Sequence, residues 1–149
     1  MELKEIHDAK TTEKRSIIVS AVNDQQQDLA IIDKARQALQ QAGDYLIYDD
    51  GDRLRIMALI SDWARVGRSL AADVSFEDST VSRRHALIVR DHDGGLHLLD
   101  DSSLNGVLVA GQRIDRHRLT DGDQFIIGRY RIHFVSVLPW LSRLRCKFF

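Results

Sequence analysis

From Asp44 onward, short apolar runs alternate with clusters of aspartate and glycine, and this alternation constrains the fold more than any other feature of the chain. The runs are rich in Ile, Val, Leu, Tyr and Phe, which favour strands. They lie at residues 45–48, 53–59, 64–66, 85–90, 96–99, 107–109, 124–127 and 131–135. Turn-forming segments such as Asp49-Asp50-Gly51-Asp52 separate them. Many short strands without an interleaved helical pattern are typical of a β-sandwich, so we predict a mainly β domain over residues 44–137.

The segment before this domain carries helical signals. Asn23 can cap a helix, and Gln26 three residues later completes a capping-box pattern. Apolar residues then recur on one stripe at helical spacing: Ile31, Ile32, Ala35, Ala38, Leu39 and Ala42. Gly43 stands where a glycine commonly ends a helix. We therefore predict an amphipathic helix over residues 23–43, which either packs on its own domain or binds a partner.

The two ends of the chain differ from the rest. Residues 1–15 are polar, and residues 16–22 form a short apolar run that could be a strand or a docking segment. We expect a flexible, disordered N-terminal arm over residues 1–22. Residues 138–149 are basic and aromatic. For this tail we expect packing beside the last strand, or a frayed end, rather than partner docking or membrane contact.

Composition excludes several classes of function. A formal net charge of −1 gives no overall field that would attract nucleic acid or a membrane surface. The single cysteine, Cys146, can form neither an internal disulfide nor a zinc site, and it suggests a reducing compartment. The N-terminus lacks the apolar region of a signal peptide, and no apolar run approaches the ~18 residues of a membrane span. We expect a cytoplasmic protein without metal or cofactor, in which any anion is bound by a local cluster of Arg or Lys.

Three short motifs lie at predicted strand ends or in loops: Gly67-Arg68, Ser82-Arg83-Arg84-His85 and Ser103-Leu104-Asn105-Gly106. Loops at one end of a sandwich come together, and such loops carry binding sites. Arg68 offers a planar fork of donors that suits phosphate, Ser82 a hydroxyl and Arg83 a second positive charge. The amide of Asn105 can both donate to and accept from a peptide main chain. The combination favours recognition of an anion on an extended peptide.

These three motifs, in this order on a β-rich chain, resemble the forkhead-associated (FHA) family over roughly residues 45–135. Residues 73–86 are similar to the central segment of that family. The resemblance implies a β-sandwich of about eleven strands that binds phosphothreonine peptides through its apical loops. It implies that Arg68 and Ser82 contact the phosphate and that Asn105 holds the peptide main chain.

The resemblance also implies supporting roles for neighbouring residues. Gly67 lets the chain approach closely, His85 braces the loop that carries Ser82, and Gly106 supports the site. Arg83, in the recognition loop, assists the phosphate.

The chain departs from the family pattern at two places. Leu104 stands where the family usually has threonine, so one hydroxyl donor is missing, and we expect Ser103 to replace it in part. Ala110-Gly111 stands where the family favours Asn-Gly. Because alanine at a positive φ costs ~1–2 kcal/mol, we expect this hairpin to use a different turn.

We therefore expect a phosphothreonine-dependent signalling adaptor downstream of a Ser/Thr kinase, not an enzyme. One alternative is a scaffold that keeps the fold and no longer needs phosphate, which Leu104 favours. A second is a hydrolase built on Ser82, His85 and one of Asp73, Asp100 or Asp101. The missing Gly-x-Ser-x-Gly elbow and oxyanion loop count against it.

The N-terminal arm supplies a possible ligand within the same chain. Lys10-Thr11-Thr12-Glu13 places two threonines where a kinase could act. Some short bacterial FHA proteins, which this layout resembles, close on their own phosphorylated N-terminal threonine. The expected partners are thus a phosphothreonine protein, or the arm phosphorylated at Thr11 or Thr12, together with the kinase.

Overall fold

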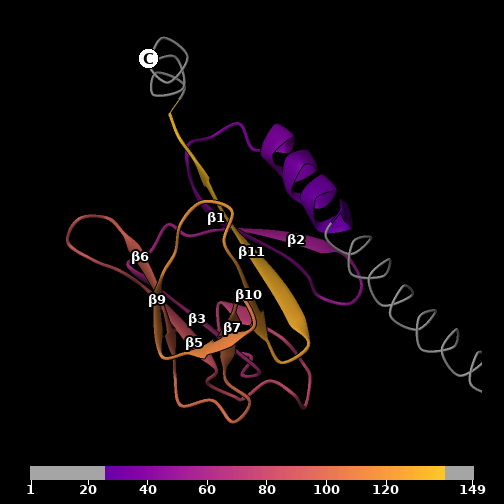
Figure 1. Cartoon of the computed structure of the whole chain (residues 1–149), viewed down its shortest axis with the longest axis vertical. Coiled ribbons are helices and arrows are strands. Elements are labelled where there is room, and N and C mark those ends of the chain that lie inside the picture. Colours follow the sequence, from indigo (N-terminus) through magenta and orange to yellow (C-terminus); the bar gives the residue numbers. More distant parts are fainter. Residues whose placement is uncertain (1–25, 140–149) are drawn as a thin grey trace, which may run out of the picture. The chain divides into compact units, whose positions relative to one another are not determined.

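The structure is a computed structural model that describes residues 26–139 (Figure 1). It is mainly β, with one helix over residues 26–38 ahead of the strands, as the sequence predicted. Within this range no helix is long and apolar enough to cross a membrane. The arm predicted over residues 1–22, with Thr11 and Thr12, lies outside the described residues, as does the tail from residue 140.

The helix ends earlier than the predicted boundary at Gly43. Its last residue is 38, and Gly43 is instead the first residue of strand β1 (Gly43–Asp49). The backbone of Gly43 pairs with Val137 in the sheet, and the Tyr45 hydroxyl donates to the carbonyl of Gln41 at 2.9 Å. Pairing of Gly43 within the sheet leaves residues 39–42, which include the last two residues of the apolar stripe, as a connection between the helix and β1.

In the described part of the chain, eleven strands form two sheets, which confirms the predicted sandwich. The first sheet has the order β2-β1-β11-β10-β7-β8 and adds β2 (Leu54–Ala58), β11 (Tyr130–Val137), β10 (Gln124–Ile127), β7 (Val107–Val109) and β8 (Gln112–Ile114) to β1. The second has the order β4-β3-β5-β6-β9, with β4 (Val74–Ser75), β3 (Trp63–Gly67), β5 (Ala86–Arg90), β6 (Leu96–Asp100) and β9 (Arg116–Arg118).

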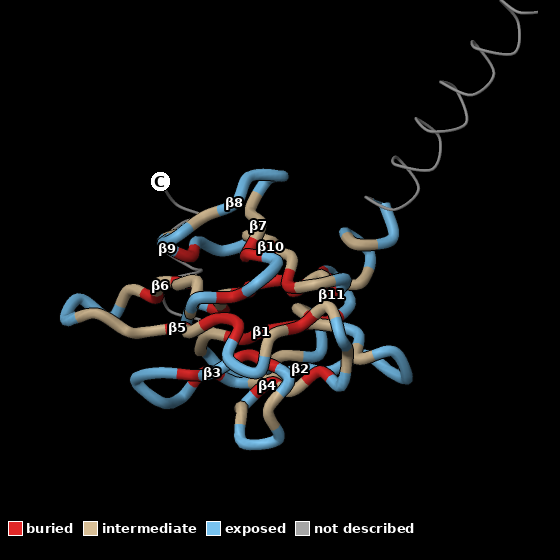
Figure 2. Tube along the Cα trace, turned by 90° about the horizontal axis from the view of Figure 1, so that it is seen from below, coloured by how far each residue is buried: buried red, intermediate tan, exposed pale blue. Residues whose placement is uncertain are grey.

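The core lies between the two sheets, and each sheet contributes alternate residues to it. Leu46, Phe125 and Ile132 come from the first sheet and Ile88 and Leu98 from the second, and all are almost fully buried. Exposed positions gather in the connecting loops (Figure 2). Burial of these side chains is the main favourable term in folding, and it fixes the register of each strand because a slip of one residue would turn the apolar face outward.

Two apolar side chains anchor the loop between β4 and β5, which carries the second motif. Phe76 stacks on Tyr130 with ring centroids 4.0 Å apart and meets Tyr48 edge to face at 5.3 Å. Val81, farther along the same loop, is only 1% exposed. The loop is therefore held by the core on both sides of Asp78-Ser79-Thr80.

The hairpin between β7 and β8 uses a two-residue turn with Ala110 at φ 50° and Gly111 at φ 76°. Both central residues are left-handed, as in a type I′ turn. The expectation of a different turn is wrong. The right-handed twist of the two flanking strands favours this turn strongly enough to place an alanine where asparagine or glycine is preferred.

We predict that Ala110→Asn stabilises the protein by about 0.5–1 kcal/mol, because asparagine tolerates the left-handed conformation that costs alanine ~1–2 kcal/mol. Gly111→Ala should have the opposite effect, although an added Cβ there would meet no atom within 4 Å. Urea unfolding of the two variants and the parent measures both changes. Equal stability of all three proteins would show that the turn is not strained.

Candidate functional site

Three connections meet at one end of the sandwich: residues 68–73 after β3, residues 76–85 between β4 and β5, and residues 101–106 after β6. We call them the apical loops. The first two are joined by backbone hydrogen bonds, from Arg68 N–H to Ser82 O at 2.9 Å and from Ser69 N–H to Arg83 O at 3.2 Å. These bonds place the first two sequence motifs side by side.

Gly67 permits this approach. A Cβ atom at this position would clash with the carbonyl oxygen of Arg83, closer than real side chains come to backbone, and would lie 3.1 Å from that of Ser82. Any other residue at position 67 would push the two loops apart. Glycine is thus required here by the closeness of two backbones, and Arg68 follows it directly.

The Arg68 side chain is braced at one nitrogen and exposed at the others. Its Nε donates to the carbonyl of Val81 at 3.1 Å, and the residue as a whole is exposed. Because Val81 is anchored in the core, this bond fixes the direction of the guanidinium. The two terminal nitrogens can then serve a ligand such as a phosphate.

Ser82 is oriented by a bond from the third loop. Its Oγ accepts from the backbone N–H of Leu104 at 3.0 Å. A hydroxyl that accepts in this way keeps its one hydrogen for another acceptor. Ser82 can therefore donate to an anion beside the Arg68 guanidinium.

His85 joins the second and third loops from below, with none of its surface exposed. Its Nδ1 accepts from Ser82 N–H at 3.0 Å, and its Nε2 lies 2.8 Å from the carbonyl oxygen of Gly106. Since a carbonyl only accepts, Nε2 carries the proton and the ring is neutral. One buried side chain therefore satisfies a donor in one loop and an acceptor in the other.

Asn105 holds the second and third loops together on the exposed side. Its Nδ2 donates to the carbonyl of Thr80 at 2.9 Å. The amide oxygen can then accept from the N–H of a peptide laid across the loops.

Ser103 does not lie with these outward-facing groups. It is 6% exposed, and its Oγ accepts from Gly106 N–H at 2.9 Å. Its own N–H donates to Asp100 Oδ1 at 3.0 Å. The expectation that Ser103 replaces the missing threonine hydroxyl stays a prediction, and the burial of this residue counts against it. Leu104, by contrast, is 83% exposed.

Sequence reasoning missed the contacts that shape the loop below Asn105. Asp78 accepts from Thr80 through both N–H at 2.8 Å and Oγ1 at 2.6 Å, and it forms an ion pair with Arg129 Nε at 2.7 Å. The hydrogen bonds from Thr80, with a smaller contribution from Arg129, lower the pKa of Asp78. The run Asp78-Ser79-Thr80 is itself a signal of a side-chain-capped turn. Arg113, on β8, also contacts the third loop, where its Nη2 donates to the carbonyl of Ser103 at 3.2 Å.

The triad that a hydrolase would need is not formed by the proposed residues. His85 Nδ1 receives the backbone N–H of Ser82 rather than its hydroxyl. Asp73 accepts from Arg65 N–H at 2.7 Å, and Asp101 forms a bidentate pair with Arg84. These groups support loops, and none is placed to activate Ser82.

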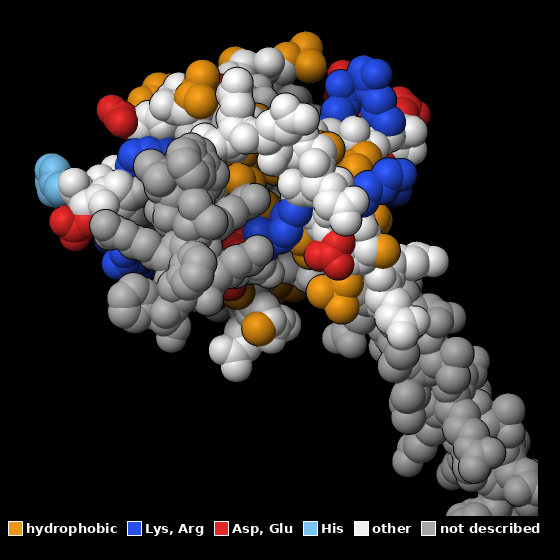
Figure 3. All heavy atoms as spheres, turned by 90° about the horizontal axis from the view of Figure 1, so that it is seen from above, with side chains coloured by type: hydrophobic (Ala, Val, Ile, Leu, Met, Phe, Trp, Pro, Cys, Tyr) orange, Lys and Arg blue, Asp and Glu red, His pale blue; other side chains and the backbone are white. Residues whose placement is uncertain are grey.

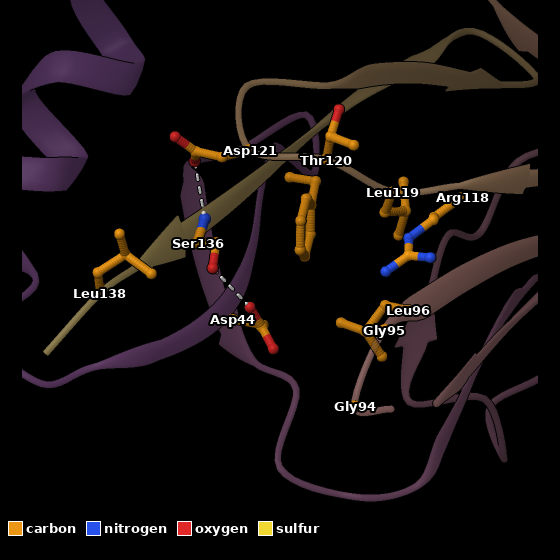
Figure 4. A pocket seen from close by; sticks show the side chains of 11 residues that line it. Asp44, Gly94, Gly95, Leu96, Arg118, Leu119, Thr120, Asp121, Ser136 and Leu138 are labelled. Atoms are coloured by element: carbon orange, nitrogen blue, oxygen red, sulfur yellow. Dashed lines mark hydrogen bonds between the residues drawn. The ribbon is translucent and has the colours of Figure 1, made fainter. Parts of the chain in front are cut away.

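A cavity of about 390 Å³ lies at the end of β6 that is away from the apical loops (Figure 4). Strand β6 starts at Leu96 in the cavity wall and ends at Asp100 beside the third loop. In the cavity wall Ser136 N–H donates to Asp121 at 2.9 Å, and Ser136 Oγ donates to Asp44 at 2.9 Å. Asp44 and Asp121 are therefore engaged in joining β1, β11 and the turn before β10.

Seen from above, basic, acidic and hydrophobic side chains are interspersed among the described residues (Figure 3).

Residues 64–128 match the family model of the FHA domain. An oxoglutarate dehydrogenase inhibitor of Corynebacterium diphtheriae is 39% identical over 70 residues, 47% of this chain and 48% of that protein. The glycogen accumulation regulator GarA of Mycolicibacterium smegmatis is also 39% identical over 70 residues, 47% of this chain and 44% of that protein. The match thus spans about half the length of these relatives.

A solved structure from a study of phosphothreonine-dependent FHA domain interactions aligns with a TM-score of 0.59 and 30% identity. The alignment covers 64% of this chain and 98% of that one. It therefore takes in almost the whole of the solved domain.

We predict that His85→Ala lowers the free energy of unfolding by about 2–4 kcal/mol, because it leaves the partly buried N–H of Ser82 and the buried carbonyl of Gly106 without partners and opens a cavity. His92→Ala, at an exposed turn position, is the matched control and should change stability by less than ~0.5 kcal/mol. Thermal unfolding of both variants gives the comparison. If the two melt alike, the bridge is not structural.

We predict that acid loosens the loop around Thr80 only below the ordinary carboxyl range. The folded-state pKa of Asp78 lies below its usual 3.8, so its contribution is complete above that value and is lost as the pH falls through the lowered pKa. The amide signals of Thr80 and Asn105, followed by NMR against pH, should move together with a midpoint under 3.8. In Asp78→Asn this step should be absent. A midpoint at or above the ordinary value would contradict the assignment.

Proposed function

Because the chain belongs to the FHA domain family, we propose that its apical loops bind a phosphothreonine segment of a partner protein. The protein would act as a non-catalytic signalling adaptor that recognises a mark written by a Ser/Thr kinase. The proposal rests mainly on two neighbouring side chains, each of which is fixed by one hydrogen bond and has a donor left for a ligand. The Arg68 guanidinium is braced through Nε, and the Ser82 hydroxyl accepts from the N–H of Leu104 and keeps its hydrogen for a ligand.

The remaining residues complete a recognition site for an extended phosphopeptide. Arg83 is exposed next to Ser82 and supplies a second positive charge for the phosphate. Asn105 supplies the acceptor for a peptide N–H. The loops are held by the close backbone approach at Gly67 and by the hydrogen bonds of His85, Ser103 and Gly106. A phosphate carries about −1.5 to −2 charges at pH 7, and each charge-assisted hydrogen bond contributes about 1.5–3 kcal/mol.

The relatives suggest what such binding is used for. One is named an inhibitor of oxoglutarate dehydrogenase and another a regulator of glycogen accumulation. By analogy, this chain would regulate a metabolic enzyme by binding it rather than by chemistry of its own.

The arm, phosphorylated at Thr11 or Thr12, would be a competing ligand for the same loops, since a tethered segment acts at a ~millimolar effective concentration.

We predict that the full chain retains peptides from an immobilised degenerate phosphothreonine library and ignores the same library without phosphate. Arg68→Ala should weaken binding of the selected phosphopeptide by about 2–5 kcal/mol, because the phosphate loses its main partner and stays desolvated. Arg118→Ala removes an exposed arginine at the far cavity and is the matched control. Calorimetry measures the affinity of the selected phosphopeptide for the parent, for Arg68→Ala and for Arg118→Ala.

Two outcomes would contradict this function. Equal binding of phosphorylated and unphosphorylated peptides would favour the scaffold that no longer needs phosphate. An Arg68→Ala variant that binds as the Arg118→Ala control does would remove the assigned phosphate contact.

A further inference from the structure

The far cavity, the space of about 390 Å³ at the end of β6 away from the apical loops, lies where β11 ends. Its lining includes three side chains of the core, Leu96, Leu119 and Phe134, each no more than 6% exposed. Leu138, the residue after β11, lines it too and is 52% exposed (Figure 4). This end of the sandwich thus has apolar walls and an apolar side chain that is left half in water.

The far cavity suits one large aromatic side chain with a polar edge. An apolar cavity of about 150 Å³ can hold a benzene ring, so the volume here is enough for an indole. Two carboxylates, Asp44 and Asp121, stand beside the apolar walls, and each accepts a hydrogen bond from Ser136. A carboxylate offers about four acceptor sites, so the N–H of a buried indole can find the acceptor that it needs there.

The alternation along β11 directs the following residues of the chain toward this cavity. Ile132 and Phe134 belong to the core, and Ser136 and Leu138 line the far cavity. Even-numbered positions therefore face the space between the sheets, as the period of two in a strand requires. The next position on this side is Trp140, which lies just beyond the described residues and about 7 Å from Leu138 along an extended chain.

Pro139 favours an extended step from Leu138 to the next residue. Its ring fixes φ near −65°, and the residue before a proline is biased toward extended conformations. Pro139 also has no N–H to donate to a ladder, and the last pair between β1 and β11 joins Gly43 to Val137. The chain that follows is therefore free of the sheet and can bend over the mouth of the cavity.

We propose that the far cavity is the docking site of the chain's own C-terminal tail, with the indole of Trp140 inserted between the two sheets. The ring packs on Leu119 and Phe134, and its N–H donates to Asp44 or Asp121. Insertion removes a large aromatic side chain from water and closes this end of the sandwich. The docking site is independent of the function proposed above, because it lies at the end of β6 away from the apical loops.

The first test measures how far water reaches Trp140. The chain has two tryptophans, and Trp63 is half exposed on β3. Trp63→Phe in the full chain therefore leaves Trp140 as the single tryptophan. In the folded protein its fluorescence should be shifted to shorter wavelength, and acrylamide should quench it less than in the same protein unfolded in urea.

Dilution identifies the chain that supplies the tryptophan. The shielding from acrylamide should not change over a wide range of protein concentration, because the indole and the cavity belong to the same molecule. Shielding that disappears on dilution would mean that a second copy supplies the tryptophan, and it would overturn the proposal.

Two variants of the full chain place the indole in the cavity. Trp140→Ala should shift the amide NMR signals of Leu96, Leu119 and Ser136, which line the cavity, and lower the melting temperature by about 4–8 °C. Leu141→Ala is the matched control, because the next position along an extended chain faces the opposite side. It should leave these signals and the melting temperature as in the parent.

Two further outcomes would overturn the docking. One is equal quenching of Trp140 in the folded and the unfolded protein. The other is a set of cavity signals that Trp140→Ala leaves in place, which is also the result if another part of the tail fills the cavity. Phosphopeptide affinity should be the same for Trp140→Ala and the parent, so failure of the docking leaves the proposed function untouched.

Discussion

The site depends on one buried imidazole. His85 receives the N–H of Ser82 and donates to the carbonyl of Gly106, so it joins two loops that are separated by a whole hairpin in the sequence. A neutral histidine is suited to this position because one ring nitrogen accepts while the other donates. Without it, the partly buried N–H of Ser82 and the buried carbonyl of Gly106 would lose their partners.

The proposed ligand contacts share a physical principle: each side chain is fixed by one polar atom and can present another. Arg68 uses Nε for the Val81 carbonyl, Ser82 uses its oxygen as an acceptor, and Asn105 uses its amide nitrogen for the Thr80 carbonyl. Side chains held in this way lose little conformational freedom when a ligand arrives, which favours affinity. The loops that carry them are fixed in turn by Phe76, Val81 and the close approach at Gly67.

Sequence patterns predicted the sandwich because turn residues and apolar runs are local signals. Eight strands were expected, and the three that were missed, β4, β8 and β9, are two or three residues long and lie at sheet edges. Such short segments form through pairing with a neighbour rather than through their own composition. The motifs predicted which loops meet, but not that Ser103 turns inward or that Asp78 and Arg129 pair. Those features depend on contacts between distant segments.

The register of β1 against β11 has a consequence for how the domain can be used. Gly43 and Val137 are direct partners, so the chain enters and leaves the β domain on adjacent strands, about 5 Å apart, at the end away from the apical loops. A domain of this kind can be inserted into a surface turn of another protein with little strain on the backbone of that protein. Its apical loops would then point away from that protein, so the same domain can be inserted into unrelated chains.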